Sequence, residues 1–141
     1  MYPPKTTSQE LTPEEKAAYA PFQALLDTLP QRNYEQMRRS LFPGGMATLI
    51  RNGQANQLHF DSFIDRLQQL PFPPGLKIEE TVHDPIVHID DDIAVIWAPY
   101  VVTVGDKIDH CGTNIVTLIR RDGRWLISNL ADNSKSDCTN K

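Results

Sequence analysis

The residues best suited to proton chemistry lie in one stretch near the carboxyl end of the sequence. His110, Gly112 and Asn114 alternate there, and alternate residues of a strand point to the same face. An imidazole can take or give a proton near neutral pH, and an amide can donate a hydrogen bond to a developing oxyanion. The glycine leaves room for a ligand to approach the backbone. The pattern indicates a proton-transfer site, although a histidine beside a turn can equally be satisfied by solvent.

Asp132 is a second candidate for proton chemistry. It follows Leu126, Ser128 and Leu130 at the two-residue period of a strand, so it is expected on their face. A carboxylate at the end of an inward row can orient or charge-balance a histidine, or act as a general base. The alternative is a solvated carboxylate at a fraying strand end. Our hypothesis is that His110 moves the proton and that Asp132 holds or assists it.

Two residues of a predicted second helix are expected at the same site. Tyr34, Met37, Arg38 and Leu41 fall within one sector at helical spacing. A guanidinium among apolar neighbours needs an acceptor, which can be a ligand oxygen or Asp132. We predict Arg38 as a catalytic residue and Tyr34 as a substrate-binding residue. The alternative for Arg38 is a stem along the edge of the core with its charge in water.

Tyr100 lies in a long apolar stretch and shares parity with Ala98 and Val102. If that row faces a cavity, its hydroxyl can donate to a substrate oxygen. The alternative is a core tyrosine with its hydroxyl at the rim. We predict Tyr100 and Asn114 as substrate-binding residues.

Metal, nucleotide and covalent chemistry are not indicated. His59, His83 and His88 lack metal-ligand spacing, and no glycine-rich phosphate loop, dinucleotide fingerprint or Gly-x-Ser-x-Gly motif occurs. We therefore predict no metal and no cofactor. Cys111 falls in a predicted strand and Cys138 in a polar tail, so we expect free thiols and neither a disulfide framework nor a zinc site.

The charge balance excludes some partners. The 141 residues include 14 basic and 18 acidic side chains, which gives a net charge of -4. A phosphate backbone would find no basic surface, so we predict no nucleic-acid partner. The first residues lack the apolar core of a secretory signal, and no run is long enough to cross a membrane. We predict a cytoplasmic location and no membrane partner.

The elements that must position these residues begin with helices. The expected order is a helix over 12–29 with a capping box at its start and a kink or break near Pro21, a helix over 33–42, a hairpin at Asn52-Gly53, and a third helix capped by Asp61.

Strands separated by short turns follow. They are expected over 76–89, 93–104, 107–120 and 124–130, and turns this short force antiparallel neighbours. Helices followed by a meander predict an α+β fold, with one domain over 12–132 and flexible termini at 1–11 and 133–141.

Residues 93–102 are apolar at both parities, so neither face of that strand is suited to water. The helices of so small a domain can cover only one face. We therefore predict a homodimer through the sheet.

Several segments resemble the nuclear transport factor 2-like (NTF2-like) superfamily, and most closely its polyketide-cyclase-like (SnoaL-like) and lumazine-binding branch. They read DIAVIWAPY at 92–100, DHCGTN at 109–114, GRWLI at 123–127 and AD at 131–132. The resemblance implies a cone-shaped fold in which helices pack on a strongly curved, mostly antiparallel sheet and enclose a pocket.

The resemblance also implies a function. Catalytic relatives carry out proton transfer without a cofactor, so we expect an isomerase, lyase or cyclase that acts on a small hydrophobic molecule of the natural-product type, for example at a rearrangement or cyclisation step in secondary metabolism. The alternative is a non-catalytic dimer of the same fold that binds a small ligand. The fold alone does not decide between them.

Overall fold

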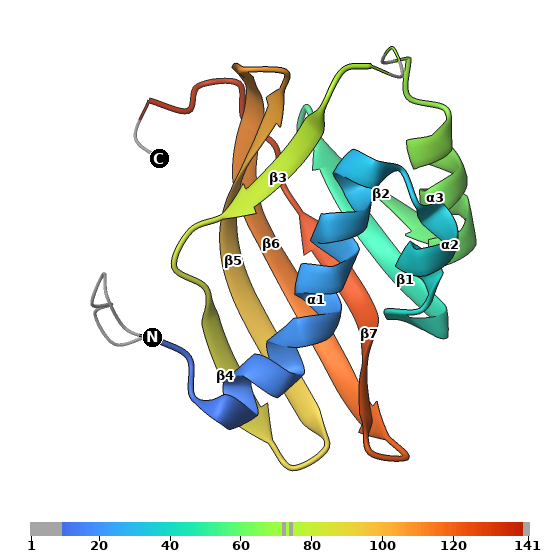
Figure 1. The fold of residues 1–141 in the computed structure, drawn as a ribbon, viewed down its shortest axis with the longest axis vertical. Coiled ribbons are helices and arrows are strands. Elements are labelled where there is room, and N and C mark those ends of the chain that lie inside the picture. The colour runs from blue at the N-terminus through green and yellow to red at the C-terminus, as the bar shows by residue number, and fades with distance from the viewer. Residues whose placement is uncertain (1–9, 72, 74, 140–141) are drawn as a thin grey trace.

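The computed structural model describes residues 10–71, 73 and 75–139 (Figure 1). In this part of the chain the helices are α1 (Pro13–Gln31), α2 (Tyr34–Arg38) and α3 (Phe60–Gln68), and the strands are β1 (Leu41–Arg51), β2 (Gln54–His59), β3 (Ile78–Val82), β4 (Ile86–Asp90), β5 (Ile93–Val104), β6 (Lys107–Arg121) and β7 (Arg124–Asp132).

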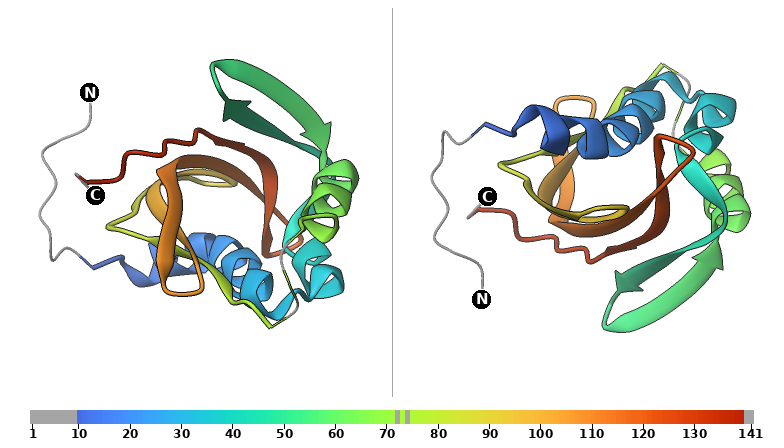
Figure 2. Two further views of the ribbon diagram at one scale, coloured as in Figure 1. Left: turned by 90° about the horizontal axis from the view of Figure 1, so that it is seen from above. Right: turned by 90° about the horizontal axis from the view of Figure 1, so that it is seen from below.

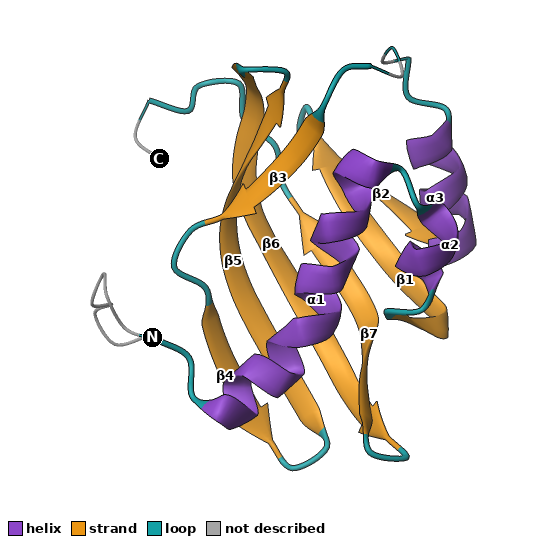
Figure 3. Cartoon of the chain, in the orientation of Figure 1, coloured by secondary structure: helices purple, strands orange, loops and turns teal. Residues whose placement is uncertain are grey.

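The strands form one curled sheet in the order β2-β1-β7-β6-β5-β3, with β4 also paired to β5. Every pairing is antiparallel except that of β1 with β7. Figure 2 shows the curl and α1 closing its open side, and Figure 3 shows α2 and α3 beside the β1–β2 hairpin. This α+β architecture confirms the predicted fold class.

Helix α1 begins as predicted and runs further than predicted. Thr12 and Glu15 form both hydrogen bonds of a capping box. Of the kink or break expected near Pro21, the break is wrong, because the helix continues through this residue. Proline removes only one backbone donor. Phe22 and Leu25, in the turn that follows Pro21, are buried in the core. Packing therefore outweighs the lost hydrogen bond.

The helix predicted over 33–42 is present as α2 but is shorter than predicted. It ends at Arg38, and Leu41 already pairs with Ile127 of β7. The Pro43–Gly45 segment interrupts the pairing inside β1, where we had expected it to end a helix. Gly44 has a φ of +89°, which favours glycine, and a Cβ on Gly45 would overlap the Phe60 ring.

The first hairpin is confirmed at Asn52-Gly53, where both residues have positive φ as a type I′ turn requires. The third helix starts earlier than predicted. Its N-cap is His59, and Asp61 lies in the first turn.

The strand predicted over 76–89 is two strands, β3 and β4. Asp84 has a φ of +50° and Pro85 lacks a backbone donor, so the ladder cannot continue through them. Both strands pair with β5, whose predicted bounds are confirmed.

An irregularity in β7 sets which side chains face the core. Thr117 pairs with Asn129 but Leu118 pairs with Ile127, so Ser128 is the extra residue of a β-bulge. The bulge shifts the parity. The buried row of β7 is consequently Trp125, Ile127 and Leu130, followed by Asp132. Asp132 thus shares its face with Leu130 as predicted, but not with Leu126 and Ser128.

The expectation of free thiols is wrong, because Cys111 and Cys138 form a disulfide. The tail that carries Cys138 was expected to fray. Its described part instead follows β6, with a bridge between Cys111 and Lys135. Residues 1–9 of the N-terminal segment predicted to be flexible lie outside the described residues. None of the described helices is long and apolar enough to cross a membrane.

Replacing Cys138 by Ser is expected to lower the free energy of unfolding by about 3 kcal/mol, because a crosslink with a sequence separation of 27 then no longer restricts the unfolded chain. Urea unfolding without reductant measures the change. Ser136→Ala keeps the disulfide and is the control. An unchanged midpoint for the Cys138 variant would contradict a crosslink in the native protein.

Candidate functional site

A cavity of about 280 Å³ lies between the concave face of the sheet and helices α1 and α3. Its volume is at the lower end for small-molecule sites. One set of lining residues is apolar: Leu29, Leu49, Phe63, Leu67, Leu70, Ile78, Val102 and Val104. The other set is polar or charged: Arg51, Arg66, Glu80, Tyr100, Asp109, His110 and Asp132. Polar groups that converge on a hollow with apolar walls are typical of a ligand site.

Glu80 is a half-buried titratable group of this cavity. It sits on β3 in the row of Ile78 and Val82, and its Oε2 accepts a hydrogen bond of 2.7 Å from Nδ2 of Asn114. Burial is the largest influence and, with the charge of Asp132, raises the pKa of Glu80 to about 7, while the Asn114 hydrogen bond and the charge of Arg51 lower it. Glu80 can therefore exchange a proton near neutral pH.

Arg51 and Asp132 form an ion pair beside Glu80. Nη1 and Nη2 of Arg51 donate to the two carboxylate oxygens of Asp132 at 2.7 and 3.4 Å. Burial lowers the pKa of Arg51, but hydrogen bonding and attraction to Asp132 outweigh it, so the pKa is raised. The pair places one positive and one negative charge near the Glu80 carboxyl group.

Tyr100 is held by the segment that follows β7. Its hydroxyl donates to the carbonyl oxygen of Asn133 at 2.5 Å. Burial, followed by the charges of Asp132 and Glu80, raises the pKa of Tyr100. The phenol therefore stays protonated, with its proton directed at Asn133.

Gly112, opposite Tyr100 in the ladder, does not leave the space for a ligand that we had expected. A Cβ there would overlap the carbonyl oxygen of Asn133. The space left by the missing side chain is therefore occupied by the backbone of Asn133.

His110 lies at the end of the cavity. Its Nδ1 is 2.8 Å from Oδ2 of Asp109, and its ring meets the Tyr100 ring edge-on at 5.7 Å between centroids. With Nδ1–H donated to Asp109, Nε2 is the nitrogen left to exchange a proton; this tautomer is assigned from the hydrogen bond. The side chain is 27% exposed, so a ligand can reach it.

Comparison with known proteins identifies the fold. Neither a protein-family model nor a curated protein matches the sequence. Solved structures do match. A protein with a cystatin-like fold from Nostoc punctiforme PCC 73102 has a TM-score of 0.73 and 11% identity over 93% of this chain and 98% of that one. An NTF2-like protein from Pseudomonas putida KT2440 has a TM-score of 0.72 and 14% identity over 89% of each chain.

The chain has an NTF2-like fold. A proposed dehydratase of the NTF2-like family from Streptomyces avermitilis matches with a TM-score of 0.68 and 11% identity, over 86% of this chain and 96% of that one. Identities this low establish the fold and leave the activity open.

The cone of this NTF2-like fold brings together four of the six predicted site residues. Tyr100, His110 and Asp132 line the cavity. Asn114 donates a hydrogen bond to Glu80, which is a lining residue. The structure does not bring the other two there. The Tyr34 hydroxyl donates to the carbonyl oxygen of Leu67 at 3.5 Å.

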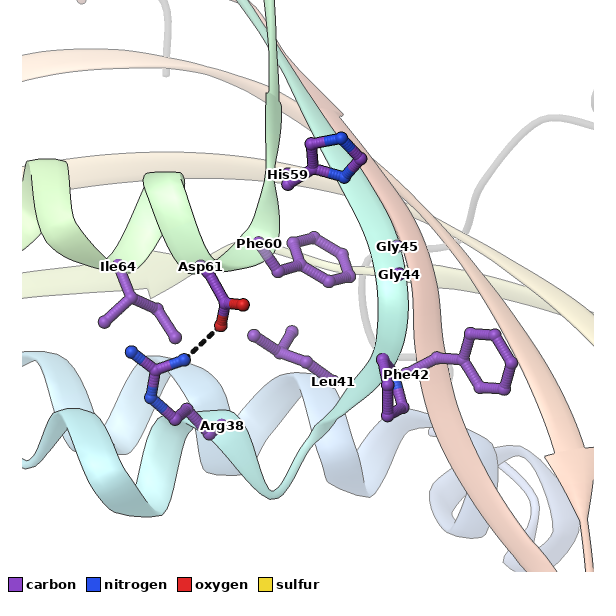
Figure 4. A pocket seen from close by; sticks show the side chains of 10 residues that line it. Arg38, Leu41, Phe42, Gly44, Gly45, His59, Phe60, Asp61 and Ile64 are labelled. Atoms are coloured by element: carbon purple, nitrogen blue, oxygen red, sulfur yellow. Dashed lines mark hydrogen bonds and ion pairs between the residues drawn. The ribbon is translucent and has the colours of Figure 1, made fainter.

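Arg38 faces a different hollow from the NTF2-like cavity. Figure 4 shows it paired with Asp61 between α2, β1 and the start of α3. Our prediction placed Arg38 on the inward face of a long helix. The helix ends at this residue, so the side chain reaches a neighbouring helix terminus instead.

Sequence reasoning missed Glu80 and Arg51, although a signal for each was present. Glu80 alternates with Ile78 and Val82, and Arg51 alternates with Ala47 and Leu49. A charged residue that continues an apolar row at strand period is a candidate for burial in a functional site. Among the described residues no group of three His, Cys, Asp or Glu side chains could hold a metal ion.

Proposed function

We propose that this protein is a cofactor-independent acid–base catalyst, an isomerase, lyase or cyclase, that acts on a small and largely hydrophobic molecule carrying a carbonyl or hydroxyl oxygen. The observation that supports this most is Glu80. Its carboxyl group has a pKa of about 7, faces a mostly apolar cavity and is oriented by Asn114. A group poised near neutral pH both accepts and returns a proton.

In the proposed step, Glu80 removes a proton from a carbon next to a carbonyl group. The electron pair of that C–H bond moves onto the oxygen, which accepts a hydrogen bond from Nε2–H of His110 in its doubly protonated form, with Nδ1–H held by Asp109. Return of the proton from Glu80 to another carbon gives an isomer. Transfer of that proton from Glu80 to a hydroxyl group on the neighbouring carbon, while the carbonyl group re-forms, expels water and gives a dehydration product. Neither outcome needs a redox partner.

In this proposal Asp132 and Arg51 adjust the pKa of Glu80. Asp132 was predicted as a catalytic residue, but its carboxylate is engaged by Arg51, and its charge raises the pKa of Glu80. We therefore assign Asp132 the role of a positioning residue. Its effect passes through the protonation of Glu80.

Opposite shifts are expected when the two tuning charges are removed. Asp132→Asn deletes the charge that raises the pKa of Glu80 and leaves Arg51 unpaired, so the apparent pKa of Glu80 should fall by roughly one unit. Arg51→Gln should raise it. NMR titration of the Glu80 carboxyl carbon measures both variants, with Asp106→Asn in an exposed turn as the control. Shifts of the same sign would contradict the assignment.

Proton exchange tests the function without knowledge of the natural substrate. Small cyclic ketones and enones are incubated with the protein in D2O, and NMR follows the loss of protons next to the carbonyl group. Catalysed exchange by the native protein and by Glu79→Gln, but not by Glu80→Gln, is expected. Exchange that survives the Glu80 change would contradict the proposal. Ligands that bind without exchange would favour a binding role.

We also propose that two copies pair through the outer face of the sheet. Ile93, Trp97 and Ile115 are 56%, 37% and 41% exposed there. Ile93 also lines an apolar hollow of about 380 Å³ on β4–β7. Light scattering should give twice the mass of the chain, and Ile93→Asp with Ile115→Asp should reduce it to one copy. A native protein that stays monomeric at high concentration would contradict the dimer.

The cytoplasmic location stays a prediction. A disulfide such as Cys111–Cys138 is more typical of oxidising compartments. Alkylation of free thiols in intact cells, followed by mass spectrometry of the two cysteines, distinguishes the two settings.

A further inference from the structure

The segment that follows β7 extends the sheet along β6. The amide of Asn133 donates to the carbonyl oxygen of Thr113 at 3.3 Å, and the Asn133 side chain accepts from the Thr113 amide at 2.8 Å. Two further bonds of 2.7 and 3.1 Å join Lys135 and Cys111. These contacts fix the course of the chain as far as Lys135.

This segment is connected to the cavity through Tyr100. The carbonyl oxygen of Asn133 accepts the hydrogen bond of the Tyr100 hydroxyl and lies over Gly112, where only a glycine leaves room for it. Tyr100 is a lining residue of the cavity. The orientation of its hydroxyl therefore depends on where the segment lies.

The far end of the segment is held by a covalent bond. Lys135, Ser136 and Asp137 are exposed, so little apolar surface keeps them in place. Cys138 is bonded to Cys111, which is fully buried in β6. Exposed backbone hydrogen bonds without an apolar contact open easily. The disulfide is thus the strongest attachment of residues 133–138 to the sheet.

We propose that residues 133–138 form a segment that holds the Tyr100 hydroxyl and is latched by the Cys111–Cys138 disulfide, and that reduction by a dithiol loosens the segment and releases this hydroxyl. The cavity then exists in two forms, and the redox state of the surroundings selects between them. A change in turnover between the two forms rests on the proposed function; the loosening itself does not.

The redox step is an ordinary thiol–disulfide exchange. A thiolate of the dithiol attacks one sulfur of the protein disulfide and forms a mixed disulfide, and the second thiolate closes the reagent into its own disulfide. The two electrons reduce Cys111 and Cys138 to thiols, which take up two protons. Reducing surroundings such as the cytosol favour the reduced protein with its loosened segment. An oxidising compartment favours the latched form with the disulfide intact.

Two measurements on the whole chain test the latch. Amide hydrogen exchange is followed at Cys111, Asn133 and Lys135 in the native protein before reduction, after a dithiol, and after reoxidation. The hydrogen bond of Tyr100 is followed through the 13Cζ resonance of labelled tyrosine, assigned with Tyr100→Phe. Cys138→Ser should reproduce the reduced state without reagent, and Ser136→Ala retains the disulfide as the matched control.

Reduction is expected to speed exchange at the segment by about tenfold or more, to move the Tyr100 resonance toward that of a solvated tyrosine, and to be reversed by oxidation. Amides of the β5–β6 ladder at Trp97 and Ile115 should stay protected, which separates local loosening from unfolding. Unchanged exchange and an unchanged Tyr100 resonance after reduction would overturn the proposal. A loosened segment with an unchanged Tyr100 resonance would overturn its link to the cavity.

Discussion

Replacing Glu80 by Gln is expected to reduce kcat/KM for proton exchange by about 10²- to 10⁴-fold, the range that a positioned acid or base contributes. The amide keeps the size of the side chain and can still interact with Asn114, but it cannot carry the proton. The loss should appear mainly in kcat, because the apolar wall that binds the substrate is unchanged.

Glu79 supplies the matched control for this prediction. It is the neighbouring residue on β3, it is exposed, and it has the opposite parity. Glu79→Gln makes the same chemical change one residue away and should leave the rate within about twofold. Equal losses in the two variants would point to general damage to β3 and would contradict a specific role for Glu80.

The second large effect is on stability. The pKa of Glu80 in the folded protein is about 7, above the ordinary 4.5, so the folded state holds its proton where the unfolded state has lost it. This contribution to stability is complete below the ordinary value and is lost as the pH rises through about 7. At higher pH the folded protein carries a half-buried carboxylate that bulk water would solvate better.

Glu80→Gln removes this penalty. The difference in free energy of unfolding between the variant and the native protein should rise by roughly 2.5 kcal/mol in favour of the variant from about pH 5 to about pH 8. Urea unfolding at the two pH values, with the disulfide intact and with Glu79→Gln alongside, measures it. A difference that stays constant across this range would show that Glu80 titrates as an ordinary exposed carboxyl.

Local patterns in the sequence predicted much of the fold. The capping box at Thr12, the hairpin at Asn52-Gly53 and the bounds of β5 depend on neighbouring residues, and all three are confirmed. The errors lie where distant contacts decide. Leu41 and Phe42 continue a helical pattern but form a strand because β7 offers a partner.

The candidate site was predictable where the strand period held. His110 and Asn114 follow the inward row of β6, as alternation predicts. Asp132 reached the cavity across a bulge at Ser128 that no sequence feature marks. Glu80 could not be assigned because the predicted strand over 76–89 runs across the boundary between β3 and β4, which obscures the short row of Ile78, Glu80 and Val82.

The disulfide was missed for a different reason. Cys111 has outward parity on β6, and Cys138 lies beyond the last predicted strand. Only the path of the tail, which folds back along β6 through Lys135, brings the two sulfur atoms together. A spacing pattern of two cysteines carries no information about such a path.

The central claim is that Glu80 holds a proton that it can exchange near neutral pH. NMR titration of the side-chain carboxyl carbon of Glu80 in the unliganded native protein tests this without any substrate. The account predicts a midpoint near 7, with Glu79 resolved in the same spectra for comparison. A midpoint at the ordinary value near 4.5 would contradict it.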